Sequence, residues 1–335
     1  MYNKADIVNR LLTGHGEALQ PEVNVFAPAN IALCKYWGKR DTELNLPVTD
    51  SLSLSLGTLG SHCRMAFHDG PADLVQLNGT TLPPEHPFVS RLARFLDLFR
   101  RAPGRRFRIE TVNTIPTAAG FASSASGFAA IVKALDVLHG WQLPERSLSI
   151  LARLGSGSAS RSLWQGFVHW HAGRDADGMD SFAQPLPEPW TDLRIGLLIL
   201  NRSRKATGST EAMRRTVETS VLYAAWPRQV ATDLAAIRQA IRDRDFAALG
   251  AAAEANALAM HATMMAARPA VLYWQPESVE AMQRTWSARA DGLALYFTMD
   301  AGPNLKLLYR EADRTTIEQQ FDGLVTANPW QEREP

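Results

Sequence analysis

The strongest constraint on the fold is a run of small residues between a predicted strand and a predicted helix. Residues 113–127 read NTIPTAAGFASSASG, and after Pro116 nearly all of the side chains are small. The stretch before it, Phe107–Val112, alternates in polarity as a half-buried strand does. The apolar residues after it have helical i, i+3, i+4 spacing: Phe128, Ile131, Val132, Leu135 and Leu138. The sequence therefore predicts a strand–loop–helix unit whose loop leaves its backbone accessible.

This loop has the chemistry of a phosphate site. Small side chains let backbone N–H groups approach an anion, and the N-terminal end of a helix adds partial positive charge. The hydroxyls of Ser123, Ser124 and Ser126 can donate further hydrogen bonds. The loop has no GxxxxGK[ST] pattern, and no GxGxxG occurs in the chain. The alternative is a tight turn with small residues for close packing, and we favour phosphate binding.

A second small-residue loop follows at 155–162, with the sequence GSGSASRS. Arg161 in this loop can bind a carboxylate or phosphate through two parallel hydrogen bonds. A flexible turn is an equal alternative for this loop alone. Two such loops in one chain favour a polyanionic ligand.

Three further segments carry polar side chains that permit two interpretations each. Residues 27–41 (APANIALCKYWGKRD) concentrate cations and aromatic rings around one glycine, but taken alone they favour a surface loop. Residues 205–213 (KATGSTEAM) place hydroxyls at a predicted helix start, where they either contact a ligand or cap the helix. Asp300 follows an apolar strand and is either a turn cap or a base held in a cleft.

Two histidines and two cysteines are discounted as sites. His169 and His171 alternate along a predicted strand and face the same side, but the sequence indicates no third metal ligand. We therefore favour a structural role for the pair and predict no protein metal site. Cys34 and Cys63 are too few for a disulfide framework and lack metal-ligand spacing.

The remaining segments mix strands and helices, so the predicted fold class is α+β. A short amphipathic helix is expected within the first twenty residues, ending at Gly14 or Gly16. Predicted strands cover Val23–Phe26, Leu52–Leu56, Cys63–Phe67, Gly166–His171, Leu193–Leu200, Leu293–Met299 and Leu305–Tyr309, the last two forming a hairpin. Predicted helices cover Pro87–Arg100, a stretch from Gly127, two segments of 228–268 that break near Asp243–Asp245, and Pro276–Ala290. Pro185, Pro187 and Pro189 predict a domain boundary at 185–192.

Charge and hydropathy exclude several classes of protein. The 35 basic and 34 acidic residues give a net charge of +1, which provides no bulk attraction to nucleic acid or an anionic membrane. No apolar run reaches the roughly 18 residues of a membrane-spanning helix. The first residues show no secretory signal, so a cytoplasmic location is expected.

Taken together, five segments resemble the mevalonate diphosphate decarboxylases of the GHMP kinase superfamily. They are APANIALCKYWGKRD, PTAAGFASSASG, GSGSASRS, GSTEAMRRTVETS and TMDAGPN, between about residues 23 and 310. A superfamily kinase would share the serine-rich loop and the fold. The segments KYWGKR, GSGSASRS and DAGPN are typical of the decarboxylase branch.

The resemblance implies a two-domain fold with an active-site cleft between the domains. Residues 1–22 would be an extension, 23–190 an ATP-binding α/β domain, and 191–325 an α+β domain. The implied reaction is ATP-dependent decarboxylation of mevalonate 5-diphosphate. ATP phosphorylates the 3-hydroxyl, and loss of phosphate and CO2 then gives isopentenyl diphosphate and ADP. The resemblance also implies Mg²⁺ held mainly through ATP, and a homodimer.

The resemblance assigns roles residue by residue. Asp300 would act beside the 3-hydroxyl as general base or positioning group, and Lys35, helped by Asn30, would stabilise the transferring phosphate. Arg161 would bind the substrate carboxylate. The implied substrate contacts are Tyr36, Trp37, Gly38, Lys39, Ser156, Gly157, Ser158, Ala159, Ser160, Ser209 and Thr210. The implied ATP contacts are Thr117, Ala118, Ala119, Gly120, Ala122, Ser123 and Ser124.

The chain departs from the family pattern at two places. Ala212 replaces a glycine, and Glu85–Phe88 lacks an arginine that the family places near the start of this helix to contact substrate. The second departure keeps open a mevalonate 5-phosphate decarboxylase of the same fold. A 3-kinase of this fold is another alternative, against which the retained KYWGK segment, Arg161 and Asp300 argue. A silent anion- or nucleotide-binding protein is a further alternative, which the intact set of Asp300, Lys35 and Arg161 disfavours.

Overall fold

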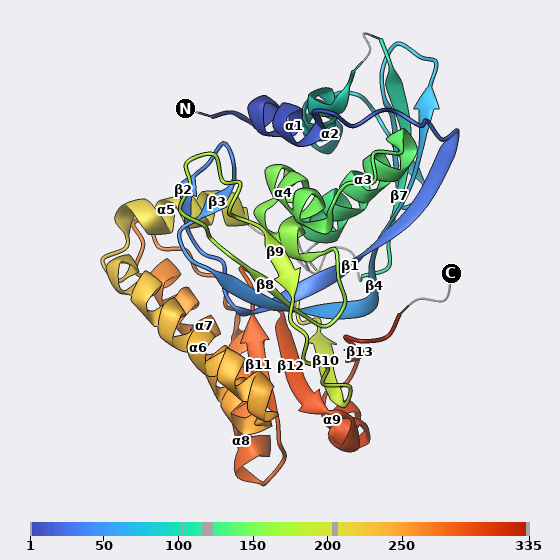
Figure 1. The fold of residues 1–335 in the computed structure, drawn as a ribbon. Helices are drawn as coiled ribbons and strands as arrows, with labels where there is room; N and C mark the ends of the chain where they lie inside the picture. The colour runs from blue at the N-terminus through green and yellow to red at the C-terminus, as the bar shows by residue number, and fades with distance from the viewer. Residues whose placement is uncertain (1, 102–103, 116–122, 203–206, 333–335) are drawn as a thin grey trace.

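The N-terminal part is built on two long antiparallel strands, β1 (Glu22–Cys34) and β4 (Ser51–His68). The computed structural model describes residues 2–101, 104–115, 123–202 and 207–332 (Figure 1). Strand β4 also pairs with β7 (Arg106–Asn113) at one end and β8 (Phe167–Trp170) at the other. The sheet is completed by β5 (Leu74–Leu77), β6 (Thr80–Leu82) and β9 (Ala183–Pro185) in the order β6-β5-β7-β4-β8-β9, with β1 on β4.

The expectation of two separate strands at 52–56 and 63–67 was wrong. Residues 51–68 form one strand that bends at Gly57, where φ is 61°. The β1 register shifts between Pro28 and Asn30, and the pairing follows the bend on both sides. A positive φ is open to glycine at little cost, so the strand turns without ending.

Helices cover one face of this sheet (Figure 1). They are α1 (Lys4–Leu12), α2 (Pro87–Leu96) with the 3-10 turn η1 (Asp97–Phe99), α3 (Ser123–His139) and α4 (Glu145–Gly155). The predicted N-terminal helix is confirmed and buries Ile7, Val8 and Leu12 in the core beneath it. Helix α4, which the sequence analysis missed, leads directly into the 3-10 turn η2 (Gly157–Arg161).

The C-terminal part is a four-stranded antiparallel sheet packed against helices. Its strand order is β11 (Tyr296–Met299), β12 (Leu305–Arg310), β10 (Leu193–Leu198) and β13 (Val325–Ala327). The predicted hairpin of β11 and β12 is confirmed. The helices are α5 (Ser209–Thr219), α6 (Trp226–Asp243), α7 (Phe246–Met265), α8 (Pro276–Ala290) and α9 (Arg314–Gln320), with 3-10 turns η3 (Tyr223–Ala225) and η4 (Glu311–Asp313). The predicted break between α6 and α7 is confirmed, because Arg244 adopts the left-handed conformation with φ 54°.

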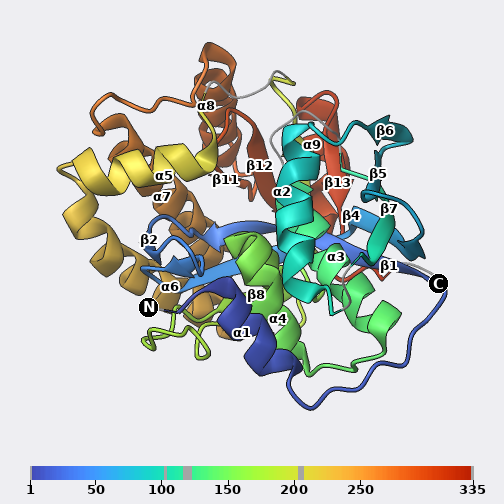
Figure 2. The ribbon, with the colours of Figure 1, turned by 90° about the horizontal axis from the view of Figure 1, so that it is seen from above.

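The two parts share a core that positions the segment after β1. Side chains of β1 and β4, such as Ile31 and Leu54, belong to the same buried cluster as Val230 of α6 and Leu249 of α7. The short strands β2 (Lys39–Asp41) and β3 (Leu46–Pro47) follow β1 and lie between α4 and α5 (Figure 2). Among the described residues, no helix combines the length and apolar character needed to cross a membrane.

Candidate active site

A cavity of 340 Å³ lies where the two parts meet. It is lined by thirteen of the residues singled out from the sequence: Asn30, Lys35, Tyr36, Trp37, Lys39, Ser124, Ser156, Gly157, Ser158, Arg161, Ser209, Thr210 and Asp300. It is also lined by residues that the sequence analysis did not select: Ala32, Asn45, Arg91, Gly155, Met213, Met260 and Ala301. The fold thus brings segments separated by more than two hundred positions in the sequence into one cavity.

The carboxylate of Asp300 sits between two buried lysines. Its Oδ1 lies 3.1 Å from Lys35 Nζ and its Oδ2 lies 3.2 Å from Lys306 Nζ, and each lysine side chain is 2% exposed. Burial by itself would raise the pKa of Asp300, but Lys306 and Lys35 overcome it and hold the pKa well below the ordinary value. Asp300 is therefore ionised at neutral pH and binds a proton only weakly.

Lys35 is fixed in place at both its side chain and its backbone. Its Nζ donates to the Ala32 carbonyl at 2.6 Å as well as to Asp300, which uses two of its three N–H donors. Burial lowers its pKa to about 8, although Asp300 opposes the shift. The backbone N–H of Lys35 donates to Asn256 Oδ1 at 2.8 Å, and Asn256 in turn donates to Asp233 at 2.7 Å. Helices α6 and α7 thus fix the backbone of Lys35 through two successive hydrogen bonds.

His261 of α7 holds the backbone of Asp300. Its Nε2 lies 3.1 Å from the Asp300 carbonyl, and burial lowers its pKa to about 3, so the ring is neutral. A neutral ring can donate here only from Nε2, which fixes its tautomer. Lys306 and His261 were missed from sequence. The available signal was a lysine inside the apolar run Leu305–Tyr309.

Arg161 supplies a further cation to the cavity wall that holds Asp300 and Lys35. Its guanidinium donates to Ser51 Oγ at 2.6 Å and to Asn30 Oδ1 at 3.3 Å, and it lies 5.6 Å from the Trp170 ring centre. Asn30 is itself oriented by donating to Ser162 Oγ at 2.7 Å. Burial lowers the pKa of Arg161 to about 10, so it remains a cation at neutral pH. The result is a rigid fork that suits a carboxylate or phosphate.

The segment 36–39 is anchored by η3 and the first residue of α6. The Trp37 carbonyl accepts from Tyr223 Oη at 3.1 Å and from Trp226 Nε1 at 3.0 Å. Gly38 follows with φ 115°, and a Cβ there would lie 1.7 Å from Tyr223 Oη. The buried hydroxyl of Tyr36 has no hydrogen-bond partner among the described residues, and burial raises its pKa. A cavity-lining donor left unpaired in this way is available to a ligand.

Two family models match this chain, "Diphosphomevalonate decarboxylase-like N-terminal domain" over residues 27–183 and "Mevalonate 5-diphosphate decarboxylase C-terminal domain" over residues 195–333. The chain is also 36% identical over 328 residues to the diphosphomevalonate decarboxylase of Aspergillus fumigatus, covering 90% of this chain and 80% of that protein. The chain therefore belongs to the diphosphomevalonate decarboxylase family.

Two solved structures extend this family assignment to the fold. The mevalonate diphosphate decarboxylase of Staphylococcus aureus has a TM-score of 0.87 at 35% identity, covering 93% of this chain and 96% of that one. A structure described as "MDDEF in complex with MVAPP, AMPPCP and Magnesium" has a TM-score of 0.85 at 39% identity, covering 92% and 96%. The predicted family and the predicted two-domain α+β fold are both confirmed.

The fold places an arginine close to one departure from the family pattern. The sequence analysis expected an arginine at 85–90 and found Glu85–Phe88 there instead, while Arg91, one turn into α2, lines the cavity. Its Nη2 donates to the Gly155 carbonyl at 2.9 Å, and nearby Lys39 donates to Asn45 Oδ1 at 2.7 Å. Burial lowers the pKa of both cations. This end of the cavity is therefore basic.

Several of the residues implied by the resemblance do not line the cavity. Ala159 and Ser160 are fully buried within η2, where the Ser160 hydroxyl donates to the Gly157 carbonyl at 2.8 Å, so they shape the turn. Gly38 is absent from the wall because it packs against Tyr223. Thr117, Ala118, Ala119, Gly120 and Ala122 lie outside the described residues, as does the side chain of Ser123. Helix α3 begins at Ser123, and Ser124 in its first turn lines the cavity.

Proposed function

We propose that the protein catalyses ATP-dependent decarboxylation of mevalonate 5-diphosphate, giving isopentenyl diphosphate, ADP, phosphate and CO2. The observation that carries the proposal is the Asp300 carboxylate held between Lys35 and Lys306 and facing the same cavity as Arg161. A tertiary hydroxide is a poor leaving group, and converting it to a phosphate removes that obstacle. The site must therefore position a hydroxyl for phosphoryl transfer and then favour loss of phosphate and CO2.

Asp300 and Lys35 act on the phosphoryl transfer. The ionised Asp300 accepts a hydrogen bond from the 3-hydroxyl and aims its oxygen at the γ-phosphate of ATP. Because its pKa is strongly lowered, Asp300 gains the proton only as the new P–O bond forms, and then gives it to the phosphate that leaves C3. Lys35 directs its remaining N–H at the transferring phosphoryl oxygens, which gain the most from a fixed cation in the transition state.

Arg161 acts on the elimination. Its fork holds the substrate carboxylate in line with the C3–O bond, so that the electrons of the breaking C–C bond form the alkene as phosphate leaves. The carboxylate becomes neutral CO2 in this step. Positioning is the main contribution expected here, because the reaction is intramolecular once the phosphate is in place.

The basic end of the cavity suits the 5-diphosphate. Arg91 and Lys39 supply two cations, and Tyr36, Ser156 and Ser158 supply hydroxyls on the same wall. Two cations at this end favour a diphosphate over the 5-monophosphate alternative. ATP is expected at the N-terminal end of α3, where Ser124 lines the cavity. Asp300 is the only carboxylate among the described lining residues and is already paired, so Mg²⁺ is expected to be held mainly by the ATP phosphates.

The proposal is tested by measuring ADP and CO2 together. Purified protein is given Mg-ATP with either mevalonate 5-diphosphate or the 5-monophosphate. Equal ADP and CO2 from the diphosphate alone is the expected result. Equal products from the monophosphate would make the protein a 5-phosphate decarboxylase, and ADP without CO2 would make it a 3-kinase. Neither product from either compound would indicate a silent binding protein.

Two expectations from the resemblance stay predictions. The first is the division into domains 23–190 and 191–325 after the extension 1–22, which limited proteolysis can examine at the proline-rich 185–192 segment. The second is the homodimer, which sedimentation of the purified protein would detect.

A further inference from the structure

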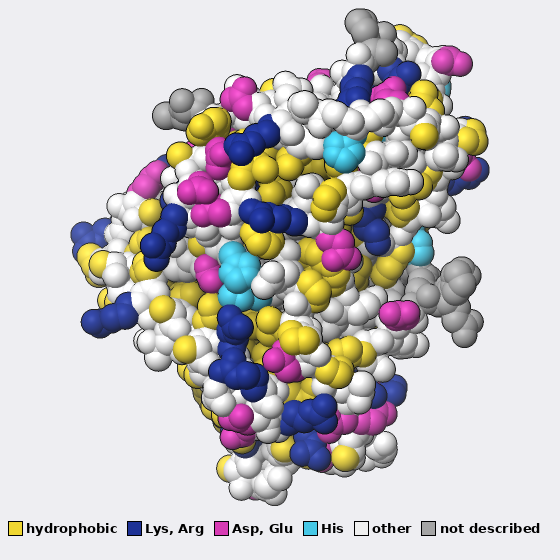
Figure 3. Space-filling model, viewed as in Figure 1, with side chains coloured by type: hydrophobic (Ala, Val, Ile, Leu, Met, Phe, Trp, Pro, Cys, Tyr) yellow, Lys and Arg dark blue, Asp and Glu magenta, His cyan; other side chains and the backbone are white. Residues whose placement is uncertain are grey.

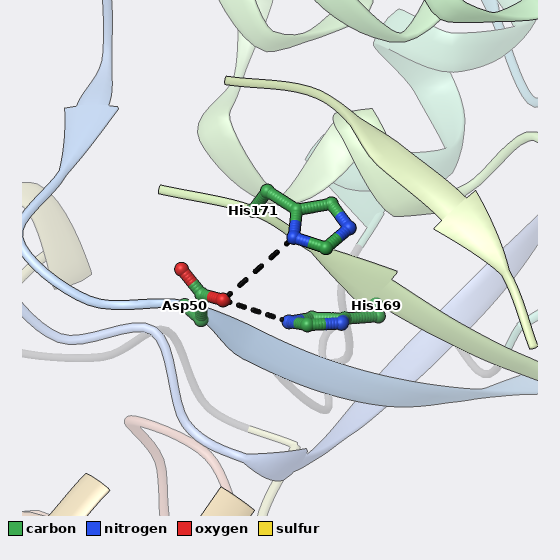
Figure 4. Close-up of side chains that lie close together, drawn as sticks. All are labelled: Asp50, His169 and His171. Atoms are coloured by element: carbon green, nitrogen blue, oxygen red, sulfur yellow. Dashed lines mark hydrogen bonds and ion pairs between the residues drawn. The ribbon is translucent and has the colours of Figure 1, made fainter. Parts of the chain in front are cut away.

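A second group of reactive side chains lies in a pocket distinct from the active-site cavity. Asp50 immediately precedes β4, while His169 and His171 lie on and just beyond β8 (Figure 4). Asp50 Oδ2 is 2.9 Å from His169 Nε2 and 3.8 Å from His171 Nδ1. The sequence analysis found no third ligand for the two histidines. The pairing of β4 with β8 supplies one.

We propose that Asp50, His169 and His171 form a binding site for a first-row divalent metal ion, with Zn²⁺ as the best match. Two imidazole nitrogens and one carboxylate oxygen are the ligands that Zn²⁺ prefers, and three protein ligands leave a position for water. The three ligand atoms all lie within 4.8 Å of one another. Metal–ligand bonds of about 2.1 Å place tetrahedral ligand atoms about 3.4 Å apart, so small side-chain rotations suffice.

The carboxylate is already oriented for this task. The Ala172 backbone N–H donates to Asp50 Oδ1 at 2.8 Å, which leaves Oδ2 facing the two rings. Such contacts from the protein fix a ligand's direction and strengthen metal binding. The two imidazole rings lie with their centres 4.1 Å apart, and His169 is 3% exposed, so one ligand is held rigidly.

The site opens into a pocket of 940 Å³ between the loop after β8 and helix α6. Histidine side chains reach the molecular surface on the face shown in Figure 3, with basic and acidic side chains near them. The pocket therefore gives a hydrated ion a route to the ligands and leaves space for bound water. Charged residues lining it besides Asp50 are Arg174, Asp180, Arg238 and Arg242.

Arg238 of α6 is the group that opposes metal binding. Its Nη1 lies 3.5 Å from His169 Nδ1. A metal ion on His169 Nε2 forces the ring proton onto Nδ1, where it would face the Arg238 donor. The cation also repels a divalent ion directly. The site should therefore bind metal modestly in the wild type, and more tightly when Arg238 is replaced by a neutral residue that can accept a hydrogen bond.

The test uses tag-free, metal-stripped protein, with Zn²⁺ titrated by calorimetry and Co²⁺ followed by its visible absorption. We expect one equivalent to bind, with cobalt bands of a four- or five-coordinate ion. His171→Ala should weaken binding by about 100-fold or more, judged against the 10–100-fold cost of losing even a supporting contact. Arg238→Gln should strengthen it several-fold. His68→Ala, at the opposite end of β4, is the matched control and should bind as the wild type does.

Three results would overturn the assignment. The first is the absence of Zn²⁺ and Co²⁺ binding at millimolar metal. The second is binding that His171→Ala leaves unchanged while thermal unfolding shows that variant to be folded. The third is binding of inorganic phosphate that Arg238→Gln abolishes, without metal binding, which would make the pocket an anion site. These readouts do not depend on turnover, so they stand whether or not the proposed decarboxylase reaction is confirmed.

Discussion

At the scale of single residues, Asp300 is the group whose removal should stop the reaction. Asp300→Ala deletes the oxygen that orients the 3-hydroxyl and leaves Lys35 and Lys306 as two buried cations without their counterion. We expect turnover to fall by about 10³-fold or more, since orientation and electrostatic stabilisation are both lost. ATP affinity should change little, because the α3 terminus is untouched. Steady-state kinetics and nucleotide titration measure both quantities, and retained turnover would contradict the assignment.

Lys35 gives the reaction a specific pH dependence. Burial lowers its pKa to about 8, so the side chain is a cation below pH 8 and loses its proton above it. The reaction needs the cation, and kcat/KM reports ionisations of the free enzyme, so kcat/KM should decline as pH rises through about 8. Lys306→Met removes a neighbouring charge that lowers the pKa of Lys35, so it should move this decline to higher pH. If kcat/KM of Lys306→Met declines at the same pH as that of the wild type, Lys35 is not the titrating group.

The residues that could be predicted from sequence were those in unusual local composition. Lys35, Arg161 and Asp300 stand in such segments, and all three line the cavity. Lys306 could not be found this way, because its contact depends on register. It pairs with Thr298 across the β11–β12 hairpin, two residues before Asp300, and so faces the same side as that carboxylate. Asp50 was missed for the same reason, since only strand pairing brings it to His169.

At the scale of elements, the shape of the 36–39 segment depends on Gly38. In Gly38→Ala the new Cβ would overlap Tyr223 Oη, which anchors the Trp37 carbonyl, and the positive φ adds strain of about 1–2 kcal/mol. We expect a large rise in KM for substrate together with a lower midpoint of unfolding. Gly292→Ala is the matched control, because Gly292 also has a positive φ, of 98°, but a Cβ there meets nothing within 4 Å. Equal effects of the two variants on KM would disprove a specific role of the Tyr223 contact.

The elements themselves were predicted best where the local sequence carries the signal. The Ala-rich composition of 228–268 located α6 and α7 with the break between them, and Pro276 marked the start of α8. The prediction failed at β4, where two strands were expected and the chain instead bends at Gly57 within one strand, and at α4, which was not predicted. Whether a glycine ends or bends a strand depends on the partners on both sides, which single-sequence periodicity does not contain.

At the scale of the whole molecule, the N-terminal helix is part of the folded body that carries the site. Ile7 is 1% exposed, and Arg101 donates to the Leu12 carbonyl at 2.8 Å, so α1 is tied to the layer that holds α2 and its cavity residue Arg91. Ile7→Ala should lower the free energy of unfolding by about 2–5 kcal/mol, the usual range for such a core truncation. Asn9→Ala, on the exposed side of the same helix, should leave it nearly unchanged. Denaturant unfolding measures both, and equal midpoints would mean that α1 is an independent appendage. Because Ile7 packs in the core and does not line the cavity, Ile7→Ala should reduce stability more than it reduces kcat at low temperature.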